Sequence, residues 1–157
     1  KMRTYSVLIL LLAMTTISCG STKEGLEWLA AKAKEDGVHE TPSGLLYKVI
    51  KSGEASAKSP LKGTPCSCHY RGTLISGKEF DSSYRRGEPT TFAPNQVIGG
   101  WTEAMQMMRE GDHWELYIKS ELAYGDRGAG GDIRPGATLI FELELLKVLG
   151  ESKRLDL

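Results

Sequence analysis

The segment TLIFELELLKV, residues 138–148, alternates apolar and polar side chains over most of its length. In a β-strand its odd-numbered residues from Leu139 to Leu145 would share one apolar face, and the two glutamates between them would lie on the other. Two shorter segments, LLYKVIK (45–51) and HWELYIK (113–119), show the same period. Several half-buried strands with few helical patterns among them predict a curved antiparallel sheet that has one apolar face.

A second pattern, near residue 100, is suited to cover that face. Four apolar residues recur at the spacing of one helix face, with Gly111 after them as a stop signal: Trp101, Ala104, Met105 and Met108. Because a short amphipathic helix must bury its apolar stripe, we expect it to pack on the concave face of the sheet, which makes the fold α+β. The start of this helix is unusual, since VIGG precedes it in place of a polar cap.

Length and charge narrow the range of functions. With 157 residues, of which 40% are apolar and 25% charged, the chain has the size and composition of one ordinary globular domain. Lys and Arg together number 20, and so do Asp and Glu. This balance gives no support to nucleic acid as a partner, or to a polybasic surface that binds membranes.

Residues 1–18 resemble a cleaved secretory signal peptide. Lys1 and Arg3 precede the apolar run VLILLLAM (7–14), which is too short to span about 30 Å of hydrocarbon as a helix. The Ser-Cys-Gly that follows resembles the lipobox of bacterial lipoproteins, in which the cysteine, here Cys19, is lipidated.

The lipobox match has one departure, because Thr16 replaces the usual aliphatic residue. We expect a protein of the cell envelope that is lipid-anchored to a bacterial membrane and faces the periplasm. The alternative is an ordinary secretory signal with an incidental cysteine.

The rest of the chain divides into three parts. Residues 19–42 comprise the lipidated cysteine and a polar tether with one short, weakly amphipathic helix, whose apolar residues are Leu26, Leu29, Ala30 and Ala33. The sequence leaves open whether this helix is a solvated spacer or docks on the domain. We expect the main domain over residues 43–150 and a C-terminal tail over residues 151–157.

Two patterns that could carry other chemistry are weak. The glycine-rich stretch AYGDRGAGGDIRPG (123–136) lacks the Gly-Lys-Ser/Thr ending of a phosphate-binding loop and indicates a long structured turn. Cys66 and Cys68 would share one face of a strand, at or beyond the separation that a disulfide allows, while His69 would point to the other face. We interpret the cysteines as small buried apolar side chains, with a thiol redox or metal protein as the less favoured alternative. We expect neither a metal nor a cofactor.

Three longer motifs point to one family. In order along the chain they are YRGTLISGKEFDSSYRRGEPTTF (70–92), VIGGWTEAM (97–105) and ELAYGDRGAGGDIRPGATLIFELELL (121–146). Together they closely resemble the FKBP-type peptidyl-prolyl cis–trans isomerases, over a stretch from about Leu45 to Val148. The resemblance implies a five-stranded antiparallel half-barrel wrapped around one short helix. It also implies an enzyme that accelerates isomerisation of X–Pro bonds.

The substrate pocket of this family lies between the sheet and the helix, and the resemblance assigns residues of this chain to it. Trp101 would form an apolar floor under the proline ring, and the backbone N–H of Ile98 would donate to a substrate carbonyl. We expect Gly99 and Gly100 to let the chain turn sharply at this point. The apolar and aromatic wall would consist of Tyr70, Phe80, Val97, Ile98, Trp101 and Phe141.

The polar groups of the pocket follow from the same resemblance. Asp81 and the hydroxyl of Tyr124 would orient the peptide, with Arg86 near Asp81 at the rim, and Ile133 would line a flap. The alternative for each wall residue is plain core packing. Asp81 is harder to explain in that way, because a buried carboxylate needs partners.

Three positions depart from better-known members of the family. Thr90 stands in place of an aromatic or apolar rim residue, and Ala129 and Asp132 stand in place of bulkier flap side chains. These departures bear on substrate preference and on binding of macrolide inhibitors. They also keep open a non-catalytic alternative, a chaperone or assembly module that holds proline-containing segments in the same groove.

The expected partners are proline-containing peptides and unfolded exported proteins. We expect a monomer, because residues 20–41 are much shorter than the dimerisation arm of some relatives.

Overall fold

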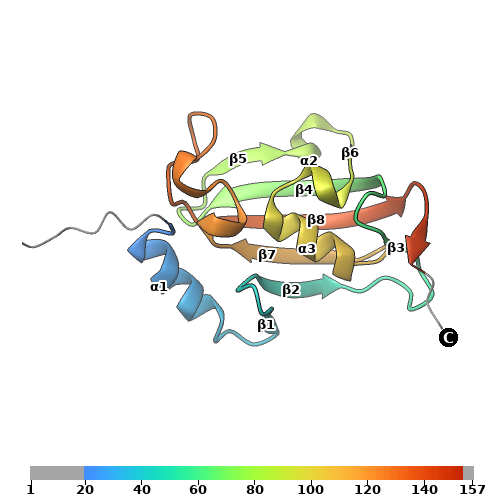
Figure 1. The fold of residues 1–157 in the computed structure, drawn as a ribbon, viewed down its shortest axis with the longest axis horizontal. Coiled ribbons are helices and arrows are strands. Elements are labelled where there is room, and N and C mark those ends of the chain that lie inside the picture. The colour runs from blue at the N-terminus through green and yellow to red at the C-terminus, as the bar shows by residue number, and fades with distance from the viewer. Residues whose placement is uncertain (1–19, 154–157) are drawn as a thin grey trace, which may run out of the picture.

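The computed structural model describes residues 20–153, and its main sheet is antiparallel throughout (Figure 1). The strands of this sheet lie side by side in the order β1 (Val38–Glu40), β2 (Leu46–Lys51), β7 (His113–Ile118), β8 (Leu139–Val148), β4 (Cys66–Leu74) and β5 (Glu79–Ser82). A seventh strand, β6 (Thr90–Phe92), also pairs with β4. A separate ribbon joins β3 (Ser59–Pro60) to β9 (Ser152–Lys153). The predicted signal peptide, the predicted lipidation site Cys19 and residues 154–157 lie outside the described part of the chain.

The predicted α+β half-barrel is confirmed, with two additions to the edges of the sheet. β5 and β6 pair with opposite ends of β4, so they form one edge strand that the short helix α2 (Ser83–Arg86) interrupts. At the other edge, β1 pairs with β2, although β1 lies in the segment that we expected to be a tether. β1 forms because Gly37, with φ +78°, turns the chain after the first helix back toward the sheet.

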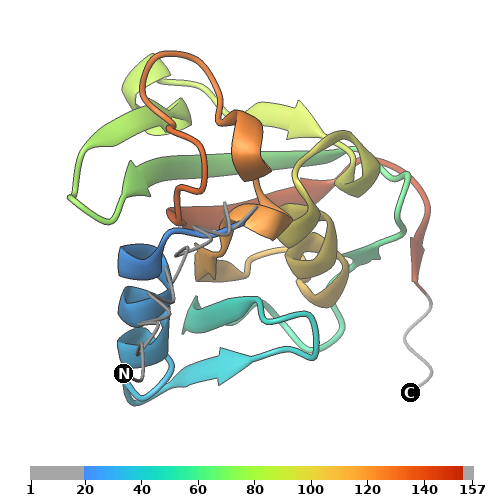
Figure 2. The same ribbon diagram turned by 60° about the vertical axis from the view of Figure 1, so that its left-hand side comes forward.

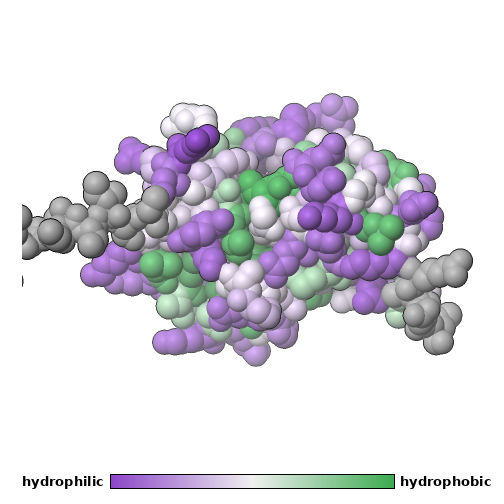
Figure 3. Space-filling view, in the orientation of Figure 1, coloured by the Kyte–Doolittle hydropathy of each residue, from purple (hydrophilic) through white to green (hydrophobic). Residues whose placement is uncertain are grey.

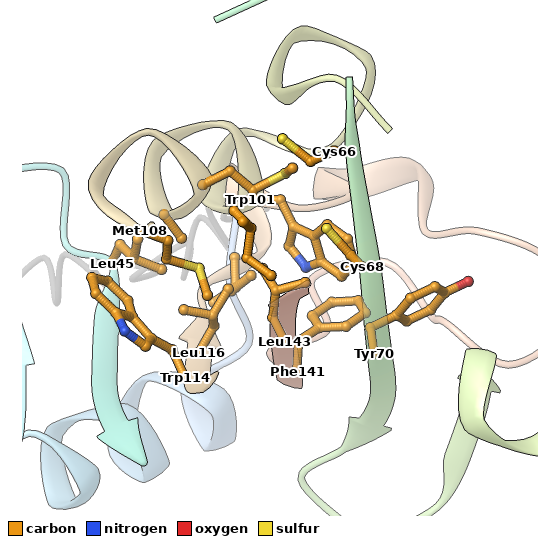
Figure 4. Close-up of a cluster of buried hydrophobic side chains, with 14 of the residues drawn as sticks. Leu45, Cys66, Cys68, Tyr70, Trp101, Met108, Trp114, Leu116, Phe141 and Leu143 are labelled. Atoms are coloured by element: carbon orange, nitrogen blue, oxygen red, sulfur yellow. The ribbon is translucent and has the colours of Figure 1, made fainter. Parts of the chain in front are cut away.

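The helix α3 (Gly99–Met107) covers the concave face of the sheet, as its apolar spacing predicts. Figure 4 shows Trp101 among the side chains that pack between this helix and the strands. The predicted stop at Gly111 is wrong, because the helix already ends at Met107. Met108 is extended, and its carbonyl accepts a hydrogen bond of 2.6 Å from the Ser59 hydroxyl on β3, which draws the chain out of the helix.

The helix α1 (Lys23–Lys32) packs on the outer face of the same sheet, so that α1 and α3 lie on opposite faces (Figure 2). Leu29 is buried against Leu46 and Tyr117, and the ring of Trp28 meets that of Tyr117 edge-on at 5.7 Å between centroids. α1 therefore docks on the domain and is not a solvated spacer. Tyr117, on the face of β7 that alternation would leave to solvent, is only 1% exposed because α1 covers it.

Cys66 and Cys68 are free thiols buried in the main core, which confirms their interpretation as small apolar side chains. Burial raises the pKa of Cys66 to about 11, with a further contribution from the charge of Glu110. Burial likewise raises the pKa of Cys68 to about 12. His69 lies on the other face of β4, where its ring stacks on that of Tyr84 at 4.6 Å between centroids. Two protonated thiols of this kind are poor nucleophiles.

Within residues 20–153, no helix combines the length and apolar character that crossing a bilayer requires. In the same part of the chain, no three or more His, Cys, Asp or Glu side chains are grouped so that they could hold a metal ion.

Candidate active site

A cavity of about 670 Å³ opens between α3, the concave face of the sheet and the loop of residues 123–136. Figure 3 shows apolar surface at this place, surrounded by hydrophilic side chains. Every residue that the sequence assigned to the pocket lines this cavity except Arg86, which lies at its rim. The lining consists of Tyr70, Phe80, Asp81, Phe92, Gln96, Val97, Ile98, Trp101, Tyr124, Ala129, Gly130, Gly131, Asp132, Ile133 and Phe141.

Trp101 is the most central aromatic residue of the cavity. Its side chain is 4% exposed, and three rings meet it nearly at right angles, with centroid distances of 5.2 Å to Tyr70, 5.5 Å to Phe92 and 5.2 Å to Phe141. Edge-to-face contacts of this kind are favourable and hold each ring in a fixed orientation. The Nε1–H of Trp101 is buried and has no acceptor among the described residues. The indole is therefore fixed among three rings at the wall of the cavity.

Gly72, on β4, makes room for two rings of the wall. A Cβ atom at this position would lie 2.6 Å from Cζ of Phe80 and 2.7 Å from Cε1 of Phe141, closer than any ordinary carbon contact. The two rings themselves meet edge to face at 5.5 Å between centroids. The absence of a side chain at residue 72 therefore lets both phenylalanines close over the strand.

The glycines at the start of α3 have a different role from the one predicted. Gly99 and Gly100 are the first two helical residues and neither has a positive φ, so the prediction of a sharp turn is wrong. A Cβ on Gly100 would lie 2.8 Å from side-chain atoms of Ile118, so glycine allows the helix to approach β7. Ile98 precedes the helix, and its N–H has no acceptor among the described residues. That donor remains available at the edge of the cavity.

Asp81 is held by partners on two sides. Its carboxylate accepts hydrogen bonds of 2.6 Å from the Tyr70 hydroxyl and 2.5 Å from the Arg86 guanidinium. Arg86 also donates to the Tyr70 hydroxyl at 2.8 Å and to the Thr90 hydroxyl at 3.2 Å. Burial alone would raise the pKa of Asp81, but these hydrogen bonds and the charge of Arg86 hold that pKa below its ordinary value. Asp81 is therefore a carboxylate in a fixed orientation at neutral pH.

Tyr124 stands on the other side of the cavity mouth and is 39% exposed. Its hydroxyl has no hydrogen-bond partner among the described residues. Burial of the ring, and then the charge of Asp81, raise the pKa of Tyr124 above its ordinary value. The hydroxyl therefore stays protonated at neutral pH and can donate to a ligand.

The loop of residues 123–136 closes one side of the cavity. Ala129 and Ile133 form an antiparallel bridge within it, with hydrogen bonds of 2.9 Å and 3.1 Å between their backbones. The bridge turns the Ile133 side chain inward, where it is 8% exposed. Asp132 forms an ion pair with Lys78 at 2.5 Å, which links the loop tip to the turn between β4 and β5.

Besides Gly130 and Gly131 of the loop, the sequence assignment missed two lining residues with larger side chains. Phe92 points from β6 toward Trp101, and Gln96 lies in the 3₁₀ turn η1 (Pro94–Gln96) just before α3. Phe92 ends the strand-like TTF, so alternation could have placed it on the inner face. No local signal marks Gln96, whose side chain accepts a hydrogen bond from the Ala93 N–H at 2.9 Å.

Comparison with known proteins agrees with this site. The family described as FKBP-type peptidyl-prolyl cis-trans isomerase matches residues 56–146. The domain that lies amino-terminal to such isomerases matches residues 15–49, which include α1 and β1.

Individual relatives are similar over most of this chain. It is 50% identical over 126 residues to the FKBP-type 22 kDa peptidyl-prolyl cis-trans isomerase of Escherichia coli, covering 80% of this chain and 60% of that protein. It is 44% identical over 125 residues to the outer membrane protein MIP of Legionella longbeachae, covering 80% of this chain and 53% of that protein. The chain thus spans less than two thirds of these relatives.

A solved structure of similar length has the same fold. A peptidyl-prolyl cis-trans isomerase from Pseudomonas syringae pv. tomato superposes with a TM-score of 0.75 at 36% identity, covering 83% of this chain and 92% of that one. The family match spans more than half of the chain and includes the strands from β3 to β7, most of β8, the helix α3 and every residue that lines the cavity. The chain therefore belongs to the family of FKBP-type peptidyl-prolyl cis–trans isomerases.

Proposed function

We propose that this chain accelerates cis–trans isomerisation of X–Pro peptide bonds in exported proteins. The observation that carries the proposal is the cavity itself, in which an indole surface is ringed by aromatic side chains and flanked by two donors without partners in the described chain. The ring of a substrate proline is apolar, and the backbone carbonyls of the peptide on either side of it need hydrogen-bond donors. The cavity offers both.

The physics of the amide bond explains why such a cavity can be a catalyst. Rotation about an X–Pro bond faces a barrier of about 18–20 kcal/mol, much of it from amide resonance, and takes about 10–100 s without help. The planar amide is charge-separated and well hydrated, whereas the twisted amide is less polar. An environment poor in water therefore disfavours the planar form relative to the twisted one, which is preferential binding of the transition state. Lowering the barrier by about 5–6 kcal/mol would raise the rate by roughly four powers of ten.

The residues around the cavity take separate roles in this proposal. Trp101 supports the proline ring, and the aromatic and apolar side chains around it exclude water. The Ile98 N–H and the Tyr124 hydroxyl donate to carbonyls of the peptide, so they hold its backbone while the bond rotates. Asp81 faces the same space with its charge fixed by Tyr70 and Arg86. No covalent intermediate is required.

The test is an isomerisation assay on a proline-containing peptide with the described part of the chain and its Trp101→Ala variant. We expect kcat/KM to fall by at least about tenfold, which corresponds to about 1.4 kcal/mol of lost transition-state stabilisation. Trp28→Ala is a matched control, because Trp28 packs on the opposite face of the sheet. Unchanged activity in Trp101→Ala would remove the proposed site. Peptide binding without acceleration in the parent protein would instead favour the holding role of a chaperone.

We further propose that the protein is a lipoprotein of the bacterial cell envelope, anchored through Cys19 and facing the periplasm. The lipobox-like Ser-Cys-Gly supports this, and one relative bears the name of an outer membrane protein. Incorporation of labelled palmitate into the full chain, and its loss in Cys19→Ala, is the expected result. No incorporation into the parent would leave an ordinary exported protein.

We also propose that the chain acts as a monomer and that its cavity binds macrolide inhibitors. α1 supports the first point, because its buried Leu29 and its Trp28 pack on the chain's own sheet and are not available to a second copy. Light scattering checks the mass. Competition between a macrolide and the peptide substrate tests binding in the cavity. Residues 90, 129 and 132 are the positions where we expect macrolide affinity to differ from that of relatives.

A further inference from the structure

The short segment of residues 20–22 crosses the base of the loop that closes the cavity. It contacts the chain just before the loop, at the 3₁₀ turn η2 (Ser120–Leu122), and the last residue of the loop, Gly136. About 100 residues of sequence separate this segment from the turn that it contacts. We call this set of contacts the clasp.

At the first end of the loop, the clasp is centred on the hydroxyl of Ser21. This hydroxyl donates to the Glu121 carboxylate at 2.7 Å, accepts from the Ser120 N–H at 2.9 Å and lies 3.1 Å from the Ser120 hydroxyl. The Ser21 N–H also donates to Glu121, at 3.0 Å. Ser21 is 6% exposed and Ser120 is 1% exposed, so water cannot readily replace these hydrogen bonds.

At the second end, the N–H of Thr22 donates to the carbonyl of Gly136 at 3.0 Å. Gly136 has φ +75°, and a Cβ atom there would lie 2.7 Å from the carbonyl oxygen of Gly20. The Gly136 N–H in turn donates to the Gly125 carbonyl at 2.9 Å, which ties the end of the loop to its beginning. The absence of a side chain at residue 136 lets the segment lie directly against the loop.

The loop between these two ends carries part of the cavity. Tyr124 supplies the free hydroxyl at the mouth, and residues 129–133 form one wall. Most of the remaining wall comes from strands and α3, which are held by regular backbone hydrogen bonding, and the rest comes from Gln96, Val97 and Ile98 just before α3. The loop is held by the Ala129–Ile133 bridge, by the ion pair of Asp132 with Lys78, by a hydrogen bond of 2.8 Å from the Gly20 N–H to Asp126, and by its two anchored ends.

We propose that the clasp is a positioning device for the cavity, in which Ser21 and its partners hold the loop in the conformation that binds peptide. The inference rests on the proposed isomerase function, but it concerns a segment that does not touch the cavity. Without the clasp the loop samples open conformations more often, and apparent affinity falls with the fraction of molecules in the competent state.

The test compares Ser21→Ala with the matched control Ser43→Ala. Ser43 also donates to a glutamate, Glu103, at 2.6 Å, but that bond lies away from the loop. The first readout is hydrogen exchange of the loop amides of Ala129, Ile133 and Gly136. Loss of a buried hydrogen bond predicts exchange that is roughly fivefold to a hundredfold faster in Ser21→Ala. The control should leave these amides as they are in the parent.

The second readout is the split between kcat and KM for a proline-containing peptide. If the competent fraction falls to about a third, KM rises about threefold while kcat changes little. If Ser21 had only a structural role, Ser21→Ala would lower the free energy of unfolding without raising KM. Glu121→Ala removes the other side of the clasp and serves as the second variant, should Ser21→Ala not fold.

The outcomes separate this inference from the function on which it rests. Faster exchange confined to the loop together with a higher KM supports the clasp. Loop exchange equal to that of the control overturns it, whether or not the protein is an isomerase. Faster loop exchange with an unchanged KM overturns the positioning role. A parent protein without isomerase activity would sink the proposed function, and the clasp would then be judged on exchange and on peptide affinity.

Discussion

The two faces of the central sheet are each covered by one helix, but the buried aromatic residues under the two helices have different surroundings. Under α1, Tyr117 is 1% exposed, meets Trp28 edge-on and has the ammonium of Lys32 at 5.0 Å from its ring centroid. Under α3, Trp101 is almost equally buried, at 4%, yet it borders a cavity of about 670 Å³. Burial of an aromatic residue thus does not distinguish a site from a core.

The inner face itself differs from one end of α3 to the other. Near the far end of α3, Met105 and Met108 pack beside Cys66 and Cys68, and flexible thioethers fill the space between helix and strands. Around Trp101 the neighbours are rigid rings that meet edge to face, and the loop of residues 123–136 bridges the remaining opening. Rigid rings cannot collapse into a gap as methionines can. The methionine end of the inner face is therefore filled, whereas the Trp101 end keeps a space for a ligand.

Leu29→Ala tests the outer face and should have the largest effect on stability. Leu29 is buried between α1 and the sheet, so its truncation should lower the free energy of unfolding by about 2–5 kcal/mol. Urea unfolding measures the change, and kcat/KM of the folded variant should stay within about twofold of the parent. Leu26→Ala is the matched control, because Leu26 lies on the same helix and is 50% exposed. A large loss of activity in Leu29→Ala would show that the two faces are coupled.

Gly72→Ala tests the inner face, and we expect a smaller loss of stability with a clear loss of activity. The new methyl group would press on Phe80 and Phe141, and overpacking of this kind costs about 1–3 kcal/mol. Because both rings border the cavity, their displacement should lower kcat/KM by at least about fivefold, or roughly 1 kcal/mol. Gly77→Ala is a control in a turn where a Cβ would meet nothing within 4 Å, although its φ of +86° adds some backbone strain. Activity equal to that of the parent would mean that the cavity tolerates repositioned rings.

Acidification should have the smallest effect, and it should act through Asp81. The folded state lowers the pKa of this carboxyl, so its charged form favours folding at pH values above the pKa of the unfolded chain. This contribution is lost as the pH falls through the lowered pKa, that is, below about pH 4. Urea unfolding midpoints at neutral and acid pH measure how strongly stability depends on pH. This dependence should be weaker in Asp81→Asn and unchanged in Asp36→Asn, a control at an exposed position. An identical slope in Asp81→Asn would contradict the assignment.

Much of the fold could be predicted because its signals are local. The alternation in residues 138–148 placed Leu139, Phe141, Leu143 and Leu145 on the inner face, and all four are buried in β8. The apolar spacing after residue 100 predicted α3 and the side that it buries. β1 was missed because three residues with no alternating apolar pattern form a strand only when a neighbour offers its edge.

The sequence predicted which residues form the site but not which contacts they make with one another. The family motifs led to Tyr70, Asp81 and Trp101, and all three line the cavity. They did not indicate that Arg86 would bind both Asp81 and the Tyr70 hydroxyl, although the need of a buried carboxylate for partners was clear. The function of Gly100 was also misjudged, since a glycine needed for close packing looks the same in sequence as one needed for a turn.

The sequence by itself determined which residues face inward, which segment forms the central helix and to which family the chain belongs. The tertiary structure alone decided that α1 covers the outer face, that a cavity remains beside Trp101, and that Ser21 meets Ser120 at the base of the loop. The physical reason is the distance along the sequence over which each kind of interaction acts. Periodicity and turn chemistry act between residues a few positions apart, whereas a cavity or a clasp depends on groups that only the folded chain brings within a few ångströms of each other.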